Sequence, residues 1–185
     1  MLLRPKTRQT AGGPSPPARW RSQRGFSILE LMVVVAIISF MMALAVPTFQ
    51  RIQRRTRTAA IVNDFRVFTQ GFLTYSVEQG GFPPEAAAGV IPTGMDSALR
   101  PTPWARPTPM GGKYNWENNQ MQLFGFRPKA AVAISSAPGA PLSLNAETIN
   151  MLYALDLFID NEVNGWNTGQ FRLSGAILPL YVIEP

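Results

Sequence analysis

Apolar residues gather in one long block near the N-terminus. Residues 26–46 read FSILELMVVVAIISFMMALAV and contain one charged residue, Glu30. As a helix this block would extend ~31 Å, which is close to the ~30 Å hydrocarbon thickness of a bilayer. The pattern therefore predicts a membrane-spanning helix.

After Pro47 the apolar residues recur at intervals of four, three, four and three, which is the spacing of one helix face. They are Ile61, Phe65, Phe68, Phe72 and Tyr75. Gly80-Gly81, followed by two prolines, is a strong stop signal. We expect one helix from Phe26 to Gln79, apolar in its first half and amphipathic in its second. Pro47 would kink this helix without ending it.

The remaining residues show short alternating patterns separated by turn residues. Residues 80–110 are rich in proline and predict an irregular loop. Residues 113–117 and 120–124 flank Asn118-Asn119 and predict a hairpin. A third strand is expected at 131–134, a helix capped by Asn145 is expected to end near Ile159, and two further strands are expected at 170–173 and 177–183.

These elements together predict an α+β fold. A long N-terminal helix, transmembrane in its first half and amphipathic in its second, would pack on a small antiparallel sheet head. The expected organisation is a basic leader over residues 1–25, the helix over 26–79 and the head over 80–185.

Charge and composition narrow the function classes. The chain has 17 basic and 11 acidic residues, and residues 1–25 hold six of the basic ones and no acid. After Gly25, 17 − 6 = 11 basic residues balance the 11 acidic ones. The positive net charge therefore comes from the basic N-terminal tail and does not indicate nucleic-acid binding. The sequence has no Cys and no His, which removes thiolate and imidazole chemistry. We expect no enzyme activity, no cofactor and no metal site.

The junction between the basic tail and the apolar block reads Arg24-Gly25-Phe26-Ser27-Ile28-Leu29-Glu30-Leu31. It resembles the processing site of type IV prepilins and of the pseudopilins of type II secretion. That resemblance implies cleavage after Gly25 by a prepilin peptidase, N-methylation of Phe26, and a role for Glu30 in assembly. Pro47 also stands where the family often has a proline.

The resemblance further implies partners and a location. The precursor would be a single-pass inner-membrane protein with its head in the periplasm, and membrane lipid would surround its helix. It would then assemble with copies of itself or other pilins, through an inner-membrane assembly platform, into a pseudopilus or a surface pilus. The protein would be a subunit of a type II secretion system or of a type IV pilus.

A conventional secretory signal peptide is the alternative. Ala43-Leu44-Ala45 fits an A-x-A cleavage site, and cutting near Ala45 would release a secreted or membrane-tethered binding domain. Against this alternative, the apolar block is longer than the 7–15 residues of an ordinary signal peptide and contains Glu30.

Two further patterns have a plain interpretation and a functional one. The cluster of Arg51, Arg54, Arg55 and Arg57 predicts a solvated helix face or a collar at the membrane surface, and a stripe for subunit packing or DNA is the alternative. Asp160, Glu162 and Asn164 alternate like the start of a calcium loop, but Phe171 stands where an EF-hand requires Glu. A plain turn is therefore the preferred interpretation of residues 160–165.

Overall fold

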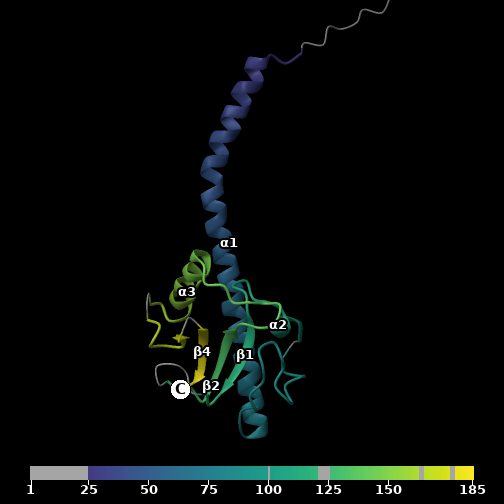
Figure 1. Ribbon diagram of the computed structural model, residues 1–185, viewed down its shortest axis with the longest axis vertical. Helices are drawn as coiled ribbons and strands as arrows, with labels where there is room; N and C mark the ends of the chain where they lie inside the picture. Colours follow the sequence, from purple (N-terminus) through teal and green to yellow (C-terminus); the bar gives the residue numbers. More distant parts are fainter. Residues whose placement is uncertain (1–24, 100, 121–125, 163–164, 176–177) are drawn as a thin grey trace, which may run out of the picture. The chain divides into compact units, whose positions relative to one another are not determined.

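The computed structural model describes residues 25–99, 101–120, 126–162, 165–175 and 178–185 (Figure 1). The chain divides into two compact units between Ala43 and Leu44. The first unit contains the beginning of the long helix, and the second contains the rest of that helix together with the head.

Helix α1 runs from Ile28 to Gln79, which confirms the predicted long helix. Pro47 lies inside it and does not end it. Because proline has no N–H, it leaves the carbonyl of Ala43 without the usual helical donor, four residues earlier. The boundary between the two compact units falls directly after Ala43. Gly80, with φ of 75°, follows the last helical turn as the predicted stop signal requires.

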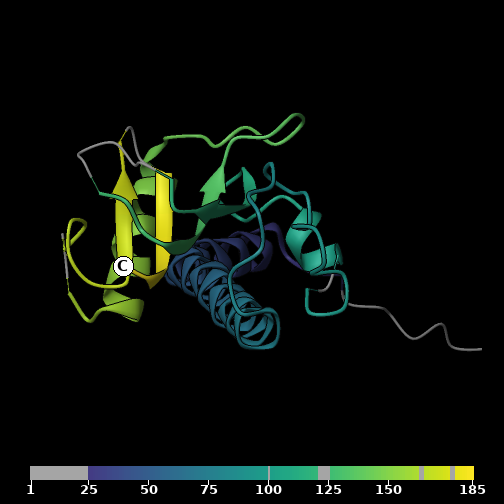
Figure 2. The ribbon, with the colours of Figure 1, turned by 90° about the horizontal axis from the view of Figure 1, so that it is seen from below.

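The head contains one four-stranded antiparallel sheet with the strand order β1-β2-β4-β3. Its strands are β1 (Lys113–Asn118), β2 (Ala130–Ser135), β3 (Phe171–Ser174) and β4 (Leu178–Glu184). The central strand β2 is buried along almost its whole length. Figure 1 shows the strands beside the second half of α1, and Figure 2 shows the sheet on one side of this helix, as the α+β prediction requires.

The predicted hairpin across Asn118-Asn119 was wrong. Strand β1 pairs with β2, so that Lys113 lies opposite Ser135 and Asn118 opposite Ala130. Asn119 does turn the chain, with φ of 54°, and its N–H donates to the carbonyl of Lys129 at 3.1 Å. Residues 121–124 of the expected second strand lie outside the described residues. The error arose because alternation shows that a segment suits a strand but does not identify its partner.

Two helices complete the head. Helix α3 (Ala146–Ile159) has the predicted cap, since the Asn145 side chain accepts the N–H of Thr148 at 2.8 Å. Helix α2 (Pro101–Ala105) is a single turn within the segment predicted to be an irregular loop. It forms there because Trp104 is completely buried, which holds this turn against the core.

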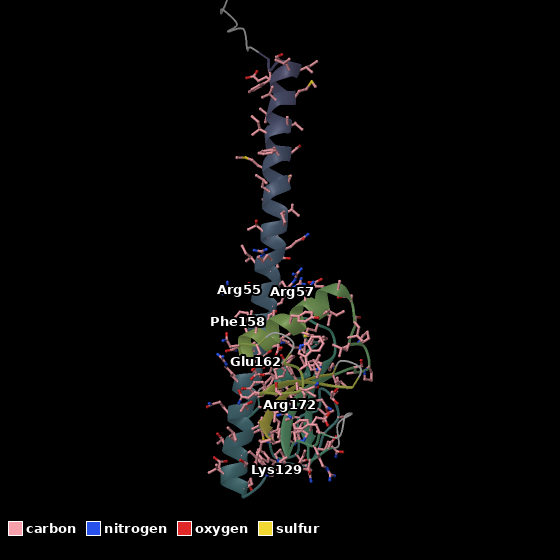
Figure 3. The ribbon with its side chains drawn as sticks, turned by 90° about the vertical axis from the view of Figure 1, so that its left-hand side faces the viewer. Arg55, Arg57, Lys129, Phe158, Glu162 and Arg172 are labelled. Atoms are coloured by element: carbon pink, nitrogen blue, oxygen red, sulfur yellow. The ribbon has the colours of Figure 1, made fainter. Side chains whose placement is uncertain are left out.

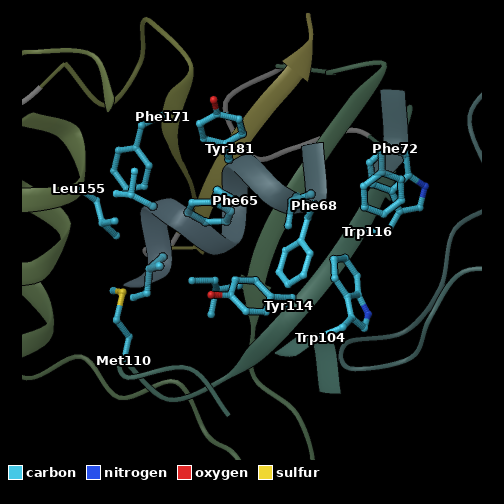
Figure 4. Close-up of a cluster of buried hydrophobic side chains, with 14 of the residues drawn as sticks. Phe65, Phe68, Phe72, Trp104, Met110, Tyr114, Trp116, Leu155, Phe171 and Tyr181 are labelled. Carbon is cyan, nitrogen blue, oxygen red and sulfur yellow. The ribbon is translucent and has the colours of Figure 1, made fainter. Parts of the chain in front are cut away.

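The core lies between the second half of α1 and the sheet (Figure 4). The predicted apolar stripe supplies it, and of its five members only Tyr75 is partly exposed. Phe68 meets the ring of Trp104 edge-on at a centroid distance of 4.9 Å and that of Tyr114 at 4.8 Å. Phe65 stacks on Tyr181 of β4 at 5.2 Å. The amphipathic half of α1 is therefore the central element of the head rather than a stalk outside it.

Candidate processing and assembly site

The chain around Gly25 is open and lies just before the helix. Gly25, Phe26 and Ser27 have no regular secondary structure, and Phe26 is 74% exposed. Helix α1 begins directly after Ser27, whose backbone carbonyl accepts the N–H of Leu31 at 3.2 Å. The peptide bond between Gly25 and Phe26 is therefore in exposed, non-helical backbone, the kind of segment that proteases reach.

Glycine at position 25 has no packing reason within this chain. A Cβ atom added there would meet nothing within 4 Å. A larger side chain would therefore cause no clash in the described structure. A requirement for glycine at this position would therefore come from a partner that binds this segment.

Glu30 lies in the first turn of α1 and is exposed. Its carboxylate is near the unsatisfied N–H groups and the positive end of the helix dipole, which favours an anion there. No ion pair joins it to any residue in the described part of the chain. Phe26 precedes Glu30 by four residues, in the non-helical segment before α1.

The apolar part of α1 is exposed throughout. Its side chains between Ile28 and Val46 face outward, and one 18-residue window of α1 has a mean hydropathy of 2.6 and is 0% buried. By length and composition it is the one helix in the described residues that is able to cross a membrane. Ser39 donates to the carbonyl of Val35 at 2.7 Å, so its hydroxyl is satisfied inside the helix. This surface needs lipid or other helices to cover it.

The arginine cluster is not simply a solvated face. Arg57 forms an ion pair with Glu147 of α3 at 2.6 Å, and the Arg55 guanidinium lies 5.8 Å from the centroid of the Phe158 ring. Arg55, Arg57 and Phe158 lie close together at one end of the head (Figure 3). Sequence reasoning missed these contacts because α3 is about ninety residues away along the chain.

The suspected calcium loop is held by its own backbone. Both carboxylate oxygens of Asp160 accept N–H groups, from Gln170 at 2.9 Å and from Phe171 at 2.7 Å. Glu162 is exposed, and Asn164 lies outside the described residues. Among the residues that the structure describes, no group of three or more acidic side chains is placed to hold a metal ion. Asp160 therefore holds this loop through its carboxylate and is a loop cap.

A partly buried polar contact between α1 and the sheet was also missed. The Tyr114 hydroxyl donates to Asp64 at 2.9 Å, and Arg106 contacts the same carboxylate oxygen at 3.3 Å. Burial, and then the charge of Asp64, raise the pKa of Tyr114. Asp64 interrupts the apolar stripe next to Phe65, and that interruption was the available signal.

Comparison with known proteins identifies the N-terminal segment. Residues 20–46 match the family described as the prokaryotic N-terminal methylation motif. Two fimbrial proteins of Pseudomonas aeruginosa are each 41% identical over 44 residues, which make up 24% of this chain and 29% of theirs. The prepilin peptidase-dependent protein D of Escherichia coli (strain K12) is 32% identical over 59 residues, 32% of this chain and 40% of that protein.

The matched stretches span less than half the length of these curated relatives. The family model places its likeness on residues 20–46, and the relatives' matches cover 24% and 32% of this chain. The motif includes the open Gly25 segment, Glu30 and the exposed apolar helix. In this segment the chain is similar to proteins that carry the prokaryotic N-terminal methylation motif, among them fimbrial and prepilin-type proteins.

Proposed function

We propose that the protein is a filament subunit that is processed after Gly25 and assembles through its N-terminal helix. The observation that carries this proposal is the methylation motif over residues 20–46, placed on an exposed apolar helix that contains one carboxylate. A prepilin peptidase would cut the chain and methylate Phe26. The result would be a subunit of a type II secretion pseudopilus or of a type IV pilus, built at an inner-membrane assembly platform.

The precursor would be a single-pass inner-membrane protein with its head in the periplasm. The six basic residues before Phe26 exceed the four arginines that follow the apolar block, and basic flanks stay on the cytoplasmic side. The backbone supports cleavage at Gly25 over cleavage near Ala45. Ala45 lies inside α1, whereas Gly25 is in exposed chain before the helix.

Glu30 would direct assembly through charge. Placing a carboxylate of an apolar helix in the bilayer costs roughly 2.5–3.5 kcal/mol near the bilayer centre and less near the edge. Such a carboxylate therefore usually has a partner of opposite charge or a hydrogen-bond donor. After cleavage the methylated amine of Phe26 on a neighbouring subunit would supply that partner. In the low dielectric of packed helices this pair would also set the axial register, because one stagger joins each Glu30 to the next Phe26.

The experiment compares Glu30→Leu, Glu30→Asp and Glu78→Leu in the same strain. Cleavage is scored by gel shift, membrane retention by fractionation, and filaments by shearing and microscopy. We expect Glu30→Leu to be cleaved and retained normally but to form few or no filaments, and the shorter Glu30→Asp to assemble poorly. Glu78 is an exposed acid near the other end of α1, so Glu78→Leu is the matched control and should assemble normally.

Filaments at the wild-type level from Glu30→Leu would show that this carboxylate does not direct assembly. N-terminal sequencing of the mature wild-type protein tests the processing step separately. N-methyl-Phe26 supports the proposal, whereas a chain beginning at Val46 would establish the signal-peptide alternative instead.

A further inference from the structure

A groove runs between α1 and α3 within the second compact unit. It consists of two hollows of about 530 and 380 Å³ that share Arg54 and Asn150. The larger hollow has no acidic residue in its lining. Apart from Asn150 it is lined by Arg51, Arg54, Arg55, Ala154, Leu157 and Phe158.

The cations of this hollow are not neutralised within the described part of the chain. Arg57, just beyond it, is paired with Glu147, but none of the three arginines in the lining makes an ion pair there. The Nε atom of Arg54 is buried and has no hydrogen-bond partner. A buried donor without a partner is costly, so an acceptor from outside is expected at this place. The charge of the lining specifies an anion.

The other wall of the hollow is apolar and accessible. Leu157 is 49% exposed and Phe158 is 39% exposed, although both face a site with three cations. Phe158 lies under the guanidinium of Arg55 at 5.8 Å, which holds this arginine on the rim. The site therefore presents positive charge beside hydrocarbon. A phospholipid offers the matching pair, a phosphate joined to acyl chains.

The position along α1 agrees with such a ligand. Arg51 follows Val46, the last residue of the apolar block, by five residues, and Arg55 follows it by nine. At ~1.5 Å per residue these are axial steps of ~8 and ~14 Å. Headgroup layers extend roughly 5–8 Å beyond the hydrocarbon on each side, so the arginines lie in this layer or just outside it.

We propose that the α1–α3 groove binds the headgroup of an anionic phospholipid in the membrane-inserted protein. The proposal rests on the proposed function, since it requires the apolar part of α1 to span the bilayer. It assigns the groove a role before assembly. The bound headgroup would keep the head at the membrane surface while the subunit is still in the bilayer.

The test uses the full-length chain in nanodiscs of mixed phosphatidylglycerol and phosphatidylcholine. The retained lipids are identified by native mass spectrometry, and hydrogen exchange is followed over α3. We expect retention of phosphatidylglycerol over phosphatidylcholine, and slower exchange in α3 when the anionic lipid is present. Each of Arg51→Gln, Arg54→Gln and Arg55→Gln should reduce the preference about fivefold.

Arg66→Gln is the matched control, because Arg66 is an exposed arginine on the same helix outside the groove. It should keep the wild-type preference. Equal loss in Arg66→Gln, or equal retention of both lipids by the wild type, would overturn the groove proposal. Inorganic phosphate at matched ionic strength should not slow exchange in α3 in nanodiscs of phosphatidylcholine alone; the same slowing would show a free-phosphate site instead.

Flotation with vesicles separates this proposal from the membrane proposal. If the chain floats with vesicles of either composition but shows no lipid preference, the membrane span is supported and the groove proposal is contradicted. A chain that does not float contradicts the membrane-inserted precursor itself.

Discussion

The ring of Phe72 on α1 stacks on that of Trp116 in β1, with centroids 3.7 Å apart and planes 8° from parallel. Both side chains are fully buried. The Trp116 indole N–H also donates to the carbonyl of Pro83 at 3.0 Å. This one contact joins the helix, the sheet edge and the proline-rich loop, so much of the stability of the head should depend on it.

Phe72→Ala should lower the free energy of unfolding of the head by about 3–5 kcal/mol, because it removes a buried ring and leaves a cavity. Leu73→Ala is the control, since Leu73 is the next residue and is 43% exposed; its effect should be within about 0.5 kcal/mol. Urea unfolding of the full-length chain in micelles, followed by tryptophan fluorescence, measures both. Similar losses in the two variants would contradict the assignment of this face to the core.

Gly25→Val should leave a full-length precursor in the membrane. The chain has open space at this position, so the substitution should not disturb its own fold, and a failure of cleavage would lie in recognition by the peptidase. Gly13→Val makes the same change earlier in the basic tail and should be processed normally. A gel shift of membrane fractions distinguishes the two forms. Normal cleavage of Gly25→Val would remove Gly25 from the proposed site.

Asp160→Ala should destabilise the head by about 1.5–3 kcal/mol, because two backbone N–H groups lose a charged acceptor. Glu162→Ala, an exposed acid of the same loop, should change little. Thermal melts of both variants in micelles provide the comparison.

Chelator should leave the wild-type melting temperature unchanged, since the Asp160 oxygens already bind the backbone. A calcium ion bound in this loop would instead add ~2.7 kcal/mol at a hundredfold excess over its dissociation constant. A calcium-dependent melting temperature would therefore contradict the assignment of Asp160 as a loop cap.

Stability should fall in strong alkali partly because of Tyr114. Burial, and then Asp64, raise its pKa in the folded chain, whereas an unfolded tyrosine loses its proton near pH 10. The contribution is therefore fully present below about pH 10 and declines above it, by up to ~1.4 kcal/mol per pH unit. Urea unfolding between pH 9 and pH 11 should show a shallower decline for Tyr114→Phe than for the wild type. Identical slopes would contradict the role of this phenol.

The sequence by itself determined the elements whose signal is local. The apolar block and the stripe from Ile61 to Tyr75 have one helical period, and helix formation depends on neighbours three and four residues away. The cap at Asn145 and the stop at Gly80 are likewise contained in a few consecutive residues. The motif that includes Gly25 and Glu30 is also local, since it lies within eight consecutive residues of the sequence.

Only the tertiary structure decided which distant segments meet. Alternation made 113–117 a strand, yet its partner is β2 and not the following residues, since strand pairing is set by packing on α1. The meeting of Arg57 with Glu147, and the groove beside them, depends on where α3 docks. The sequence shows a cluster of arginines that favour acidic partners, but it does not show which acids lie near them. The fold decides this, because charges interact strongly only when it brings them within a few ångströms.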